Sequence, residues 1–188
     1  MFPTPEQVAD ELLVLHAQSG DRRALAVLAH RWERRLLLHA MRLTNNPEGA
    51  REVTQETWLA ITRGIARLSD HTSFRAWAYA ILRRKAADWI RRRQRDRATT
   101  TLATDHPAPP DAPPPTPIAH ALATLAPDER ELITLHHVEG LGILELADVF
   151  SVPTGTIKSR LFAARAHLRA AVEAANPSEK ENCHATHR

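Results

Sequence analysis

The sequence LGILELADVFSVPTGTIKSRLFAARAHL, residues 141–168, decides the fold of the C-terminal part of this chain. Its first half carries apolar residues at the spacing of an α-helix, namely Ile143, Leu146, Ala147 and Phe150. The tripeptide Ser151-Val152-Pro153 interrupts this pattern, because proline cannot continue a helical hydrogen-bond ladder but is well tolerated in the first turn of a new helix. The stretch therefore predicts two helices joined by a tight turn.

The second of these helices has two chemically different faces. Its apolar stripe has spacings of four, three and four residues and consists of Ile157, Leu161, Ala164 and Leu168. The opposite face is cationic, has one aromatic ring and no acid, and carries Lys158, Ser159, Phe162, Arg165 and Arg169. Lysine and arginine bind phosphates or guanine edges in the major groove, and a phenyl ring can touch a thymine methyl group. This face is typical of a DNA-reading helix, although a solvated surface helix has the same pattern.

The composition indicates a folded, basic chain. Its 188 residues allow one or two domains, and a hydrophobic content of 43% is enough for a packed core. The net charge is only +3, but the sequence pI is about 9.6 and the basic residues are clustered, which favours a polyanionic partner.

Cellular location can also be read from the sequence. A single cysteine, Cys183, excludes an internal disulfide and favours a reducing compartment. The N-terminus has no basic segment before an apolar run, and no apolar run approaches the roughly 18 residues of a membrane span. We therefore expect a cytoplasmic protein without membrane insertion.

The whole chain is predicted to be all-α. Apolar residues recur at helical spacing in the N-terminal half over residues 6–19, 22–44, 47–68 and 74–95. Asn45 or Asn46 is a candidate cap for the third of these helices and Ser73 for the fourth. Further helices are expected over residues 118–125 and 127–138, before the opening motif. No segment alternates with the two-residue period of a strand.

A proline-rich segment separates two predicted helical domains. Residues 98–117 contain TDHPAPPDAPPPTP, which has no large apolar residue and predicts an extended linker. At about 3.1 Å per residue such a linker reaches roughly 60 Å, and two turns of duplex DNA measure about 70 Å. The predicted organisation is a domain over residues 1–97, the linker, a domain over 118–175 and a flexible tail over 176–188.

The fourth predicted helix becomes strongly basic toward its C-terminal end. Residues 83–97 contain eight basic residues and two acids. A phosphate backbone would neutralise this charge and release counterions, and interleaved aromatic rings can stack on bases of single-stranded DNA. Core packing is the favoured alternative for Trp77 and Trp89, and a solvated helix end is the alternative for the arginines.

The third predicted helix differs from the fourth, because its charges are mixed. Glu48, Arg51, Glu52, Gln55 and Glu56 are typical of a protein-facing surface, although a solvated face fits equally well. This helix is therefore a candidate for contact with another protein.

Enzyme chemistry finds no support in the sequence. There is no glycine-rich phosphate loop, no HExxH motif and no nucleophile elbow. His136 and His137 are adjacent, so a helix points them about 100° apart, and Cys183, His184 and His187 would hold a soft metal only weakly. We expect no catalytic residue, no metal and no cofactor.

Three motifs, in this order, resemble those of bacterial RNA polymerase sigma factors of the extracytoplasmic-function type, group 4 of the sigma-70 family. The motifs are VTQETWLAI at residues 53–61, SFRAWAYAILRRKAADWIRRR at 73–93 and LAPDERELITLHHVEGLGILELADVFSVPTGTIKSRLFAARAHLR at 125–169. The resemblance covers about residues 11–172 apart from the linker, and it implies two helical modules, the family's regions two and four.

The resemblance assigns a role to each predicted surface. Region two would bind the clamp helices of core polymerase at Glu48, Arg51, Glu52, Gln55, Glu56 and Trp58. The loop over residues 69–73 would capture a flipped base of the −10 element with Asp70, His71 and Thr72. The fourth helix would hold −10 DNA with Arg75, Tyr79, Arg83, Arg84, Arg91 and Arg92. Region four would read the −35 element with Thr156, Lys158, Ser159, Phe162, Arg165 and Arg169. The family often has aspartate at the position of Gly49 and arginine at that of Ala163.

The implied function is that of a dissociable specificity subunit. It would bind the clamp helices and the flap of core RNA polymerase, direct the enzyme to promoter DNA, help to open the promoter and be controlled by an anti-sigma factor. One alternative is a helix-turn-helix regulator that dimerises on a palindrome without core polymerase. Another is a helical adaptor whose basic helix binds an acidic protein or RNA.

Overall fold

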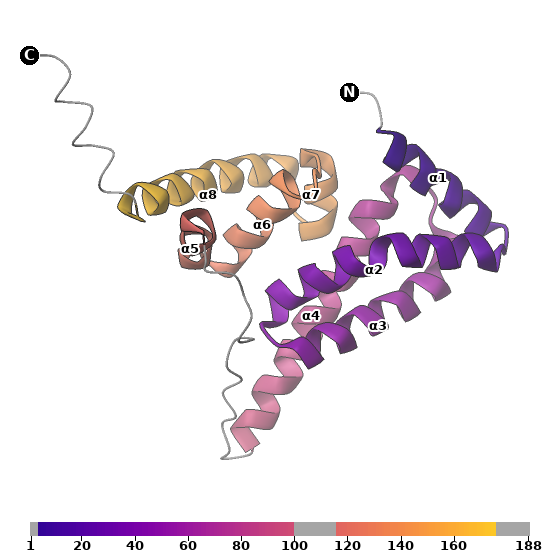
Figure 1. The fold of residues 1–188 in the computed structure, drawn as a ribbon, viewed down its shortest axis with the longest axis horizontal. Helices are drawn as coiled ribbons and strands as arrows, with labels where there is room; N and C mark the ends of the chain where they lie inside the picture. Colours follow the sequence, from indigo (N-terminus) through magenta and orange to yellow (C-terminus); the bar gives the residue numbers. More distant parts are fainter. Residues whose placement is uncertain (1–3, 100–115, 176–188) are drawn as a thin grey trace, which may run out of the picture. The chain divides into compact units, whose positions relative to one another are not determined.

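The computed structural model describes residues 4–99 and 116–175 (Figure 1). These residues are helical and contain no strand, which confirms the all-α prediction. The chain divides into two compact units, one with helices α1–α4 and the other with α5, α6, most of α7 and α8. The proline-rich segment 100–115 and the tail 176–188, with Cys183, His184 and His187, lie outside the described residues.

Four long helices build the first unit. They are α1 (Pro5–Gln18), α2 (Arg22–Thr44), α3 (Pro47–Gly64) and α4 (Phe74–Thr99), and α2 packs against the other three. In the core, the Trp32 ring of α2 lies edge-on to Phe74, with centroids 5.3 Å apart, and to Tyr79, at 5.9 Å. Such edge-to-face pairs favour one packing arrangement beyond simple burial of apolar area.

A buried carboxylate fastens α1 to α2. Asp10, which is 5% exposed, accepts hydrogen bonds from Trp32 Nε1 at 2.9 Å and from Arg31 Nε at 2.7 Å. Both oxygens of the carboxylate therefore accept a hydrogen bond, which offsets the cost of burying a charge.

Two consecutive asparagines make the turn between α2 and α3. Asn45 has φ = 47°, a left-handed conformation that asparagine tolerates, and ends α2. Asn46 begins α3, and its side-chain oxygen accepts a hydrogen bond of 2.7 Å from the Gly49 backbone N–H. The sequence left open which asparagine caps α3, and the structure assigns this role to Asn46.

Replacing this cap is expected to destabilise the first unit. Asn46→Ala leaves the buried Gly49 N–H without its acceptor and should lower the free energy of unfolding by about 1 kcal/mol. All four tryptophans, at positions 32, 58, 77 and 89, lie in the first unit, so denaturation followed by tryptophan fluorescence measures this unit alone. Asn46→Ser, which keeps a capping oxygen, should keep most of the stability that Asn46→Ala loses. Equal losses of stability for both variants would contradict the capping role.

The third helix ends earlier than predicted. We expected it to reach residue 68, but α3 ends at Gly64 and a 3-10 turn, η1 (Ile65–Arg67), follows. The Gln18 side-chain amide donates hydrogen bonds to the carbonyls of Ile65 at 3.1 Å and Leu68 at 2.6 Å, so these groups are satisfied outside an α-helical ladder. The fourth helix ends later than predicted, at Thr99 instead of residue 95.

The second unit contains α5 (Pro117–Thr124), α6 (Pro127–His137), most of α7 (Ile143–Phe150) and α8 (Thr154–Ala175), and α8 packs against α5 and α6. Its core contains the buried side chains Leu132, Leu135, Leu141, Leu146, Ile157 and Leu161. The Arg130 guanidinium donates to the carbonyls of Leu122, Ala123 and Leu125 at 2.8, 2.6 and 3.0 Å, which satisfies the open C-terminal end of α5.

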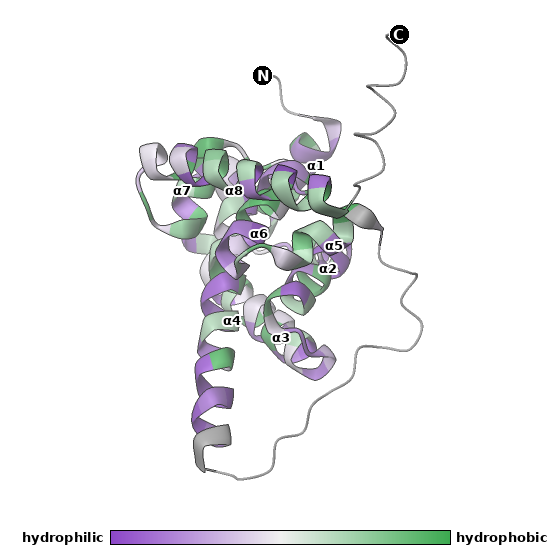
Figure 2. Ribbon diagram, turned by 90° about the vertical axis from the view of Figure 1, so that its left-hand side faces the viewer, coloured by the Kyte–Doolittle hydropathy of each residue, from purple (hydrophilic) through white to green (hydrophobic). Residues whose placement is uncertain are grey.

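Among the described residues, no helix has the length and apolar character needed to cross a membrane. Figure 2 shows mostly hydrophilic residues along the C-terminal half of α4.

Candidate nucleic-acid and polymerase interfaces

The turn before α8 has the geometry of a helix-turn-helix. Ser151 has φ = 53°, and the Val152 N–H donates to the Ala147 carbonyl at 3.1 Å, which closes α7. The Pro153 carbonyl accepts from the Ile157 N–H at 3.2 Å, so Pro153 stands immediately before α8 and not within its first turn. Since the proline nitrogen carries no hydrogen, Pro153 precedes the helix without leaving a backbone donor unsatisfied.

The two faces predicted for α8 are present in the structure. Ile157, Leu161 and Ala164 are buried, while Leu168 is only half-buried. Of the residues expected to read the −35 element, Thr156 is half-exposed and the others are exposed: Lys158, Ser159, Phe162, Arg165 and Arg169. Phe162 is 78% exposed, so its apolar ring is available to a partner rather than committed to the core.

A histidine of α6 contacts the cationic face of α8. Arg165 Nε donates to His137 Nε2 at 3.3 Å, and the His136 ring lies edge-on to His137 with centroids 4.7 Å apart. Burial lowers the pKa of His137, and the neighbouring His136 and Arg165 lower it further. The ring is therefore neutral near pH 7, as it must be to accept a hydrogen bond from a guanidinium.

Most of the predicted −10 residues of α4 reach the surface. Arg75 and Arg83 are half-buried, whereas Arg84, Arg91 and Arg92 are exposed. Arg84 Nε donates to the Ala80 carbonyl of its own helix at 3.2 Å, and Arg91 pairs with Asp88 one turn away. The arginines thus share one helix but have different partners.

Tyr79 corrects the predicted set. It is 1% exposed, and its ring lies against Trp32 and against His39, whose centroid is 5.1 Å away. The first turns of α4 pack against both α2 and α3, so side chains over more than half of the helix circumference are enclosed there. The prediction that Tyr79 contacts DNA is wrong, because the core holds this residue.

The loop before α4 is shaped by Asp70. Residues His71–Ser73 form a 3-10 turn, η2, and the Asp70 carboxylate accepts from the Thr72 N–H at 2.9 Å and from the Thr72 hydroxyl at 2.7 Å. Asp70 therefore caps η2, the turn that leads into α4. The hydroxyl of Ser73, the predicted cap of the fourth helix, donates to the Asp70 backbone carbonyl at 2.7 Å. The Thr72 hydroxyl and N–H lower the pKa of Asp70.

This pKa shift gives a direct test of the loop geometry. Thr72→Ala removes the hydroxyl that contributes most to the shift, so the pKa of the Asp70 carboxyl should rise toward its ordinary value of about 4. Because the folded-state pKa is lowered, the stabilisation is present above that ordinary value and is lost as pH falls through the lowered pKa. A carbon-detected NMR titration of the Asp70 carboxyl measures the pKa, and denaturation of the first unit at several pH values measures the stabilisation. Ser73→Ala is the matched control and should leave this pKa unchanged, since the Ser73 hydroxyl bonds the backbone and not the carboxylate.

The mixed-charge face of α3 is also exposed. Glu48, Arg51, Glu52 and Gln55 are exposed, and Glu56 is half-exposed. Trp58 is half-buried, so it presents only part of its indole. The predicted polymerase residues therefore occupy one accessible helix, with Trp58 at its margin.

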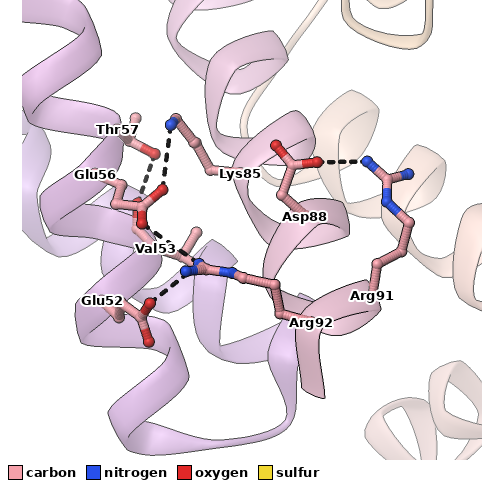
Figure 3. A network of polar contacts seen from close by, with 8 residues as sticks. All are labelled: Glu52, Val53, Glu56, Thr57, Lys85, Asp88, Arg91 and Arg92. Atoms are coloured by element: carbon pink, nitrogen blue, oxygen red, sulfur yellow. Dashed lines mark hydrogen bonds and ion pairs between the residues drawn. The ribbon is translucent and has the colours of Figure 1, made fainter. Parts of the chain in front are cut away.

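Two carboxylates of α3 are bonded to α4, as Figure 3 shows. Arg92 Nη2 lies 3.1 Å from Glu52 Oε1 and 3.4 Å from Glu56 Oε1, and Lys85 Nζ lies 3.1 Å from Glu56 Oε2. The remaining oxygen, Glu52 Oε2, accepts from Trp89 Nε1 at 2.9 Å. We call Glu52, Glu56, Lys85 and Arg92 the α3–α4 charge cluster. It joins a predicted polymerase surface to a predicted DNA surface.

The indole of Trp89 lies directly on Gly49. A Cβ atom added at Gly49 would be 2.4 Å from Trp89 Cζ2, a distance that no real side chain can occupy without displacement. Trp89 is 9% exposed and belongs to the core, as favoured from the sequence. Glycine at this position is thus explained by the close approach of an indole ring.

Two models of known families match the chain: Sigma-70 region 2 over residues 28–96, and Sigma-70, region 4 over residues 116–168. The ECF RNA polymerase sigma factor SigC of Mycobacterium tuberculosis is 32% identical over 174 residues, which span 86% of this chain and 90% of SigC. The chain belongs to the extracytoplasmic-function family of RNA polymerase sigma factors. As a sigma factor, it functions in transcription initiation.

Other relatives agree with this assignment. The RNA polymerase sigma-H factor of Pseudomonas aeruginosa is 26% identical over 185 residues, covering 89% of this sigma factor and 95% of the relative. The solved structure of CnrH in complex with the cytosolic domain of CnrY matches with a TM-score of 0.65 and 26% identity, over 88% of this sigma factor and 98% of the matched chain.

The structure adds two residues that sequence reasoning did not assign to the sites of this sigma factor. Lys85 and Trp89 both bond the carboxylates of α3. A signal was present in the sequence, since Glu52 and Glu56 repeat at four residues and Lys85, Trp89 and Arg92 follow the same helical stripe on α4. Within the residues that the structure describes, no group of histidine, cysteine or acidic side chains is arranged to hold a metal ion.

Proposed function

We propose that this sigma factor binds core RNA polymerase through α3 and promoter DNA through α4, the loop over residues 69–73 and α8. The observation that carries the proposal is the contrast within the first unit. One helix presents the carboxylate-rich surface of Glu48, Glu52 and Glu56, and the next presents the exposed arginines Arg84, Arg91 and Arg92. A protein partner for α3 and a nucleic-acid partner for α4 match these opposite charges.

Polymerase binding is assigned to Glu48, Arg51, Glu52, Gln55, Glu56 and Trp58, which would contact the clamp helices of the core enzyme. Five of these six side chains lie along the accessible face of α3, and Trp58 borders it. Contact of the second unit with the flap would complete the attachment to the core enzyme.

Recognition of the −10 element is assigned to the loop and to the exposed side of α4. Because the Thr72 N–H and hydroxyl donate to the Asp70 carboxylate, we infer that these two residues hold the shape of the loop that captures a flipped base, and that His71 supplies the ring that contacts it. Flipping a base costs a few kcal/mol, which stacking and hydrogen bonds in a shaped pocket can offset. Arg75, Arg83, Arg84, Arg91 and Arg92 would hold the neighbouring phosphates.

Recognition of the −35 element is assigned to α8. Lys158 and Arg165 supply cationic donors for guanine edges or phosphates, Phe162 supplies an apolar contact for a thymine methyl, and Thr156, Ser159 and Arg169 extend the surface along the groove. The chain itself carries out no chemical step in this proposal, since the polymerase makes the RNA.

Control by an anti-sigma factor is part of the same proposal. The related CnrH is solved in complex with the cytosolic domain of CnrY. A partner of this kind, covering the polymerase and DNA surfaces, would keep the sigma factor inactive in the cytoplasm until a signal releases it.

Run-off transcription tests the proposal. Purified chain and cognate core polymerase, supplied with fragmented genomic DNA, should give discrete start sites that core polymerase alone does not give. The absence of selective start sites would contradict the assignment of these surfaces. Selective DNA binding with a symmetric footprint and no need for core polymerase would instead favour the helix-turn-helix regulator.

A further inference from the structure

The α3–α4 charge cluster places a predicted polymerase surface and a predicted DNA surface in direct contact within one molecule. Glu52 and Glu56 belong to α3, and Lys85 and Arg92 belong to α4 (Figure 3). Two negative and two positive side chains leave the cluster with no net charge. In the free protein, these four side chains therefore compensate one another's charge across the two surfaces.

Every carboxylate oxygen of Glu52 and Glu56 takes part in this charge compensation. Glu52 uses one oxygen for Arg92, at 3.1 Å, and the other for the Trp89 indole, at 2.9 Å. Glu56 uses one oxygen for Arg92, at 3.4 Å, and the other for Lys85, at 3.1 Å. A cation of a polymerase partner that approaches α3 therefore competes with cations that the chain already supplies.

The same competition holds on the DNA side. A phosphate that approaches Arg92 must draw its guanidinium away from two carboxylates one helical turn apart. Arg91, its neighbour, differs in that its partner Asp88 belongs to the same helix. Lys85 and Arg92 of α4 lie within ion-pair distance of the α3 carboxylates, so these two residues connect the two surfaces.

We propose that the α3–α4 charge cluster couples the two interfaces, so that binding of core polymerase to Glu52 and Glu56 releases Lys85 and Arg92 for DNA. This inference rests on the proposed function and adds a regulatory step to it. Because coupling between two sites is reciprocal, DNA held by Arg92 must strengthen polymerase binding by the same factor. The free sigma factor thereby binds nucleic acid less tightly than the sigma factor that is bound to polymerase.

The size of the effect follows from the exposure of the cluster. The side chains of Lys85 and Glu56 are 34% and 31% exposed, and those of Arg92 and Glu52 are 45% and 47% exposed. Solvent and salt screen pairs of this kind, so we expect a coupling of about fivefold at low ionic strength, and less as salt is added.

A purely structural role for the cluster makes the opposite prediction. If the ion pairs only hold α3 against α4, removing Arg92 should loosen the polymerase surface and weaken binding of the core enzyme. If the cluster couples the interfaces, removing Arg92 frees Glu52 and Glu56 and strengthens that binding. The sign of one affinity change therefore separates the two explanations.

The experiment uses the full chain and measures binding of fluorescently labelled protein to cognate core polymerase without DNA. Arg92→Gln should bind about threefold to fivefold more tightly than wild type. Arg91→Gln is the matched control, since it removes the same charge from the same helix but breaks only a pair within α4. Binding of Arg92→Gln that is unchanged or weaker relative to Arg91→Gln would overturn the proposal.

The reciprocal measurement uses a labelled oligothymidylate and no polymerase. Glu56→Gln should bind it about threefold to fivefold more tightly than Glu33→Gln, which removes one exposed acidic charge from α2. Equal affinities of the two variants would likewise overturn the coupling. Failure of the wild-type chain to bind core polymerase would be a different result, since it contradicts the proposed function itself.

Discussion

Lys158→Glu is expected to lower transcription from a −35-dependent promoter about 10- to 100-fold, the equivalent of roughly 1–3 kcal/mol for one lost DNA contact. Lys158 is exposed on the outward face of α8, beside Phe162, while Ile157 on the other side of the helix is buried. The substitution replaces a cation that would face phosphates or a guanine edge by an anion that they repel. Run-off transcription with reconstituted holoenzyme measures the loss.

The specificity of this effect can be tested with a second charge reversal on the same helix. Arg160 is also exposed but lies about 200° around the helix from Lys158. Arg160→Glu should reduce transcription less than threefold, because it changes the net charge equally without entering the predicted DNA surface. Binding of Lys158→Glu to core polymerase should equal that of wild type; a large loss of that binding would refute the division of roles between α3 and α8.

The helix boundaries that sequence reasoning placed correctly are those with strong local signals. Residues 22–44 were predicted as one helix, and α2 is Arg22–Thr44, because Gly20-Asp21 stands before it and Asn45-Asn46-Pro47 after it. The opening motif likewise predicted both helices around Ser151-Val152-Pro153. In each case, the residues that begin or end the helix lie next to it in the sequence, so the local sequence is sufficient to predict the boundary.

The predictions that failed depend on contacts between distant segments. The end of α3 at Gly64 coincides with hydrogen bonds from Gln18, a residue of α1. Tyr79 carries an aromatic ring of the kind that stacks on bases, but α2 and α3 enclose the first turns of α4. The periodicity of residues within α4 does not reveal that two helices cover it. Local sequence gives the type of an element more reliably than the neighbours that will surround it.

The candidate site also contains features that follow from local sequence and features that depend on the packing of distant segments. The exposed cationic face of α8 follows directly from helical periodicity. The α3–α4 charge cluster does not, because it requires the register of two helices that are separated by two 3-10 turns and the loop between them. Charges at suitable spacing on both helices permit such pairing, and the packing of Trp89 on Gly49 brings Glu52 beside Arg92.

Gly49→Ala is expected to lower the free energy of unfolding of the first unit by about 1–3 kcal/mol. An added Cβ would lie 2.4 Å from Cζ2 and 2.7 Å from Cε2 of Trp89, which is nearly buried and cannot move without opening the contact between α3 and α4. The sign is informative because alanine is otherwise favoured over glycine inside a helix by about 1 kcal/mol. Denaturation followed by tryptophan fluorescence measures the change in this unit.

The second variant needed for this test is Trp89→Ala, which removes the ring that the new methyl group would meet. In that background Gly49→Ala should be neutral or stabilising by up to about 1 kcal/mol, so the same substitution changes sign. An equal loss in both backgrounds would show that the strain lies elsewhere. Aspartate at position 49 should behave as alanine does, because any Cβ meets the same ring. This sigma factor therefore combines glycine at position 49 with tryptophan at position 89 as a size-matched pair, and the pair holds Glu52 beside Arg92.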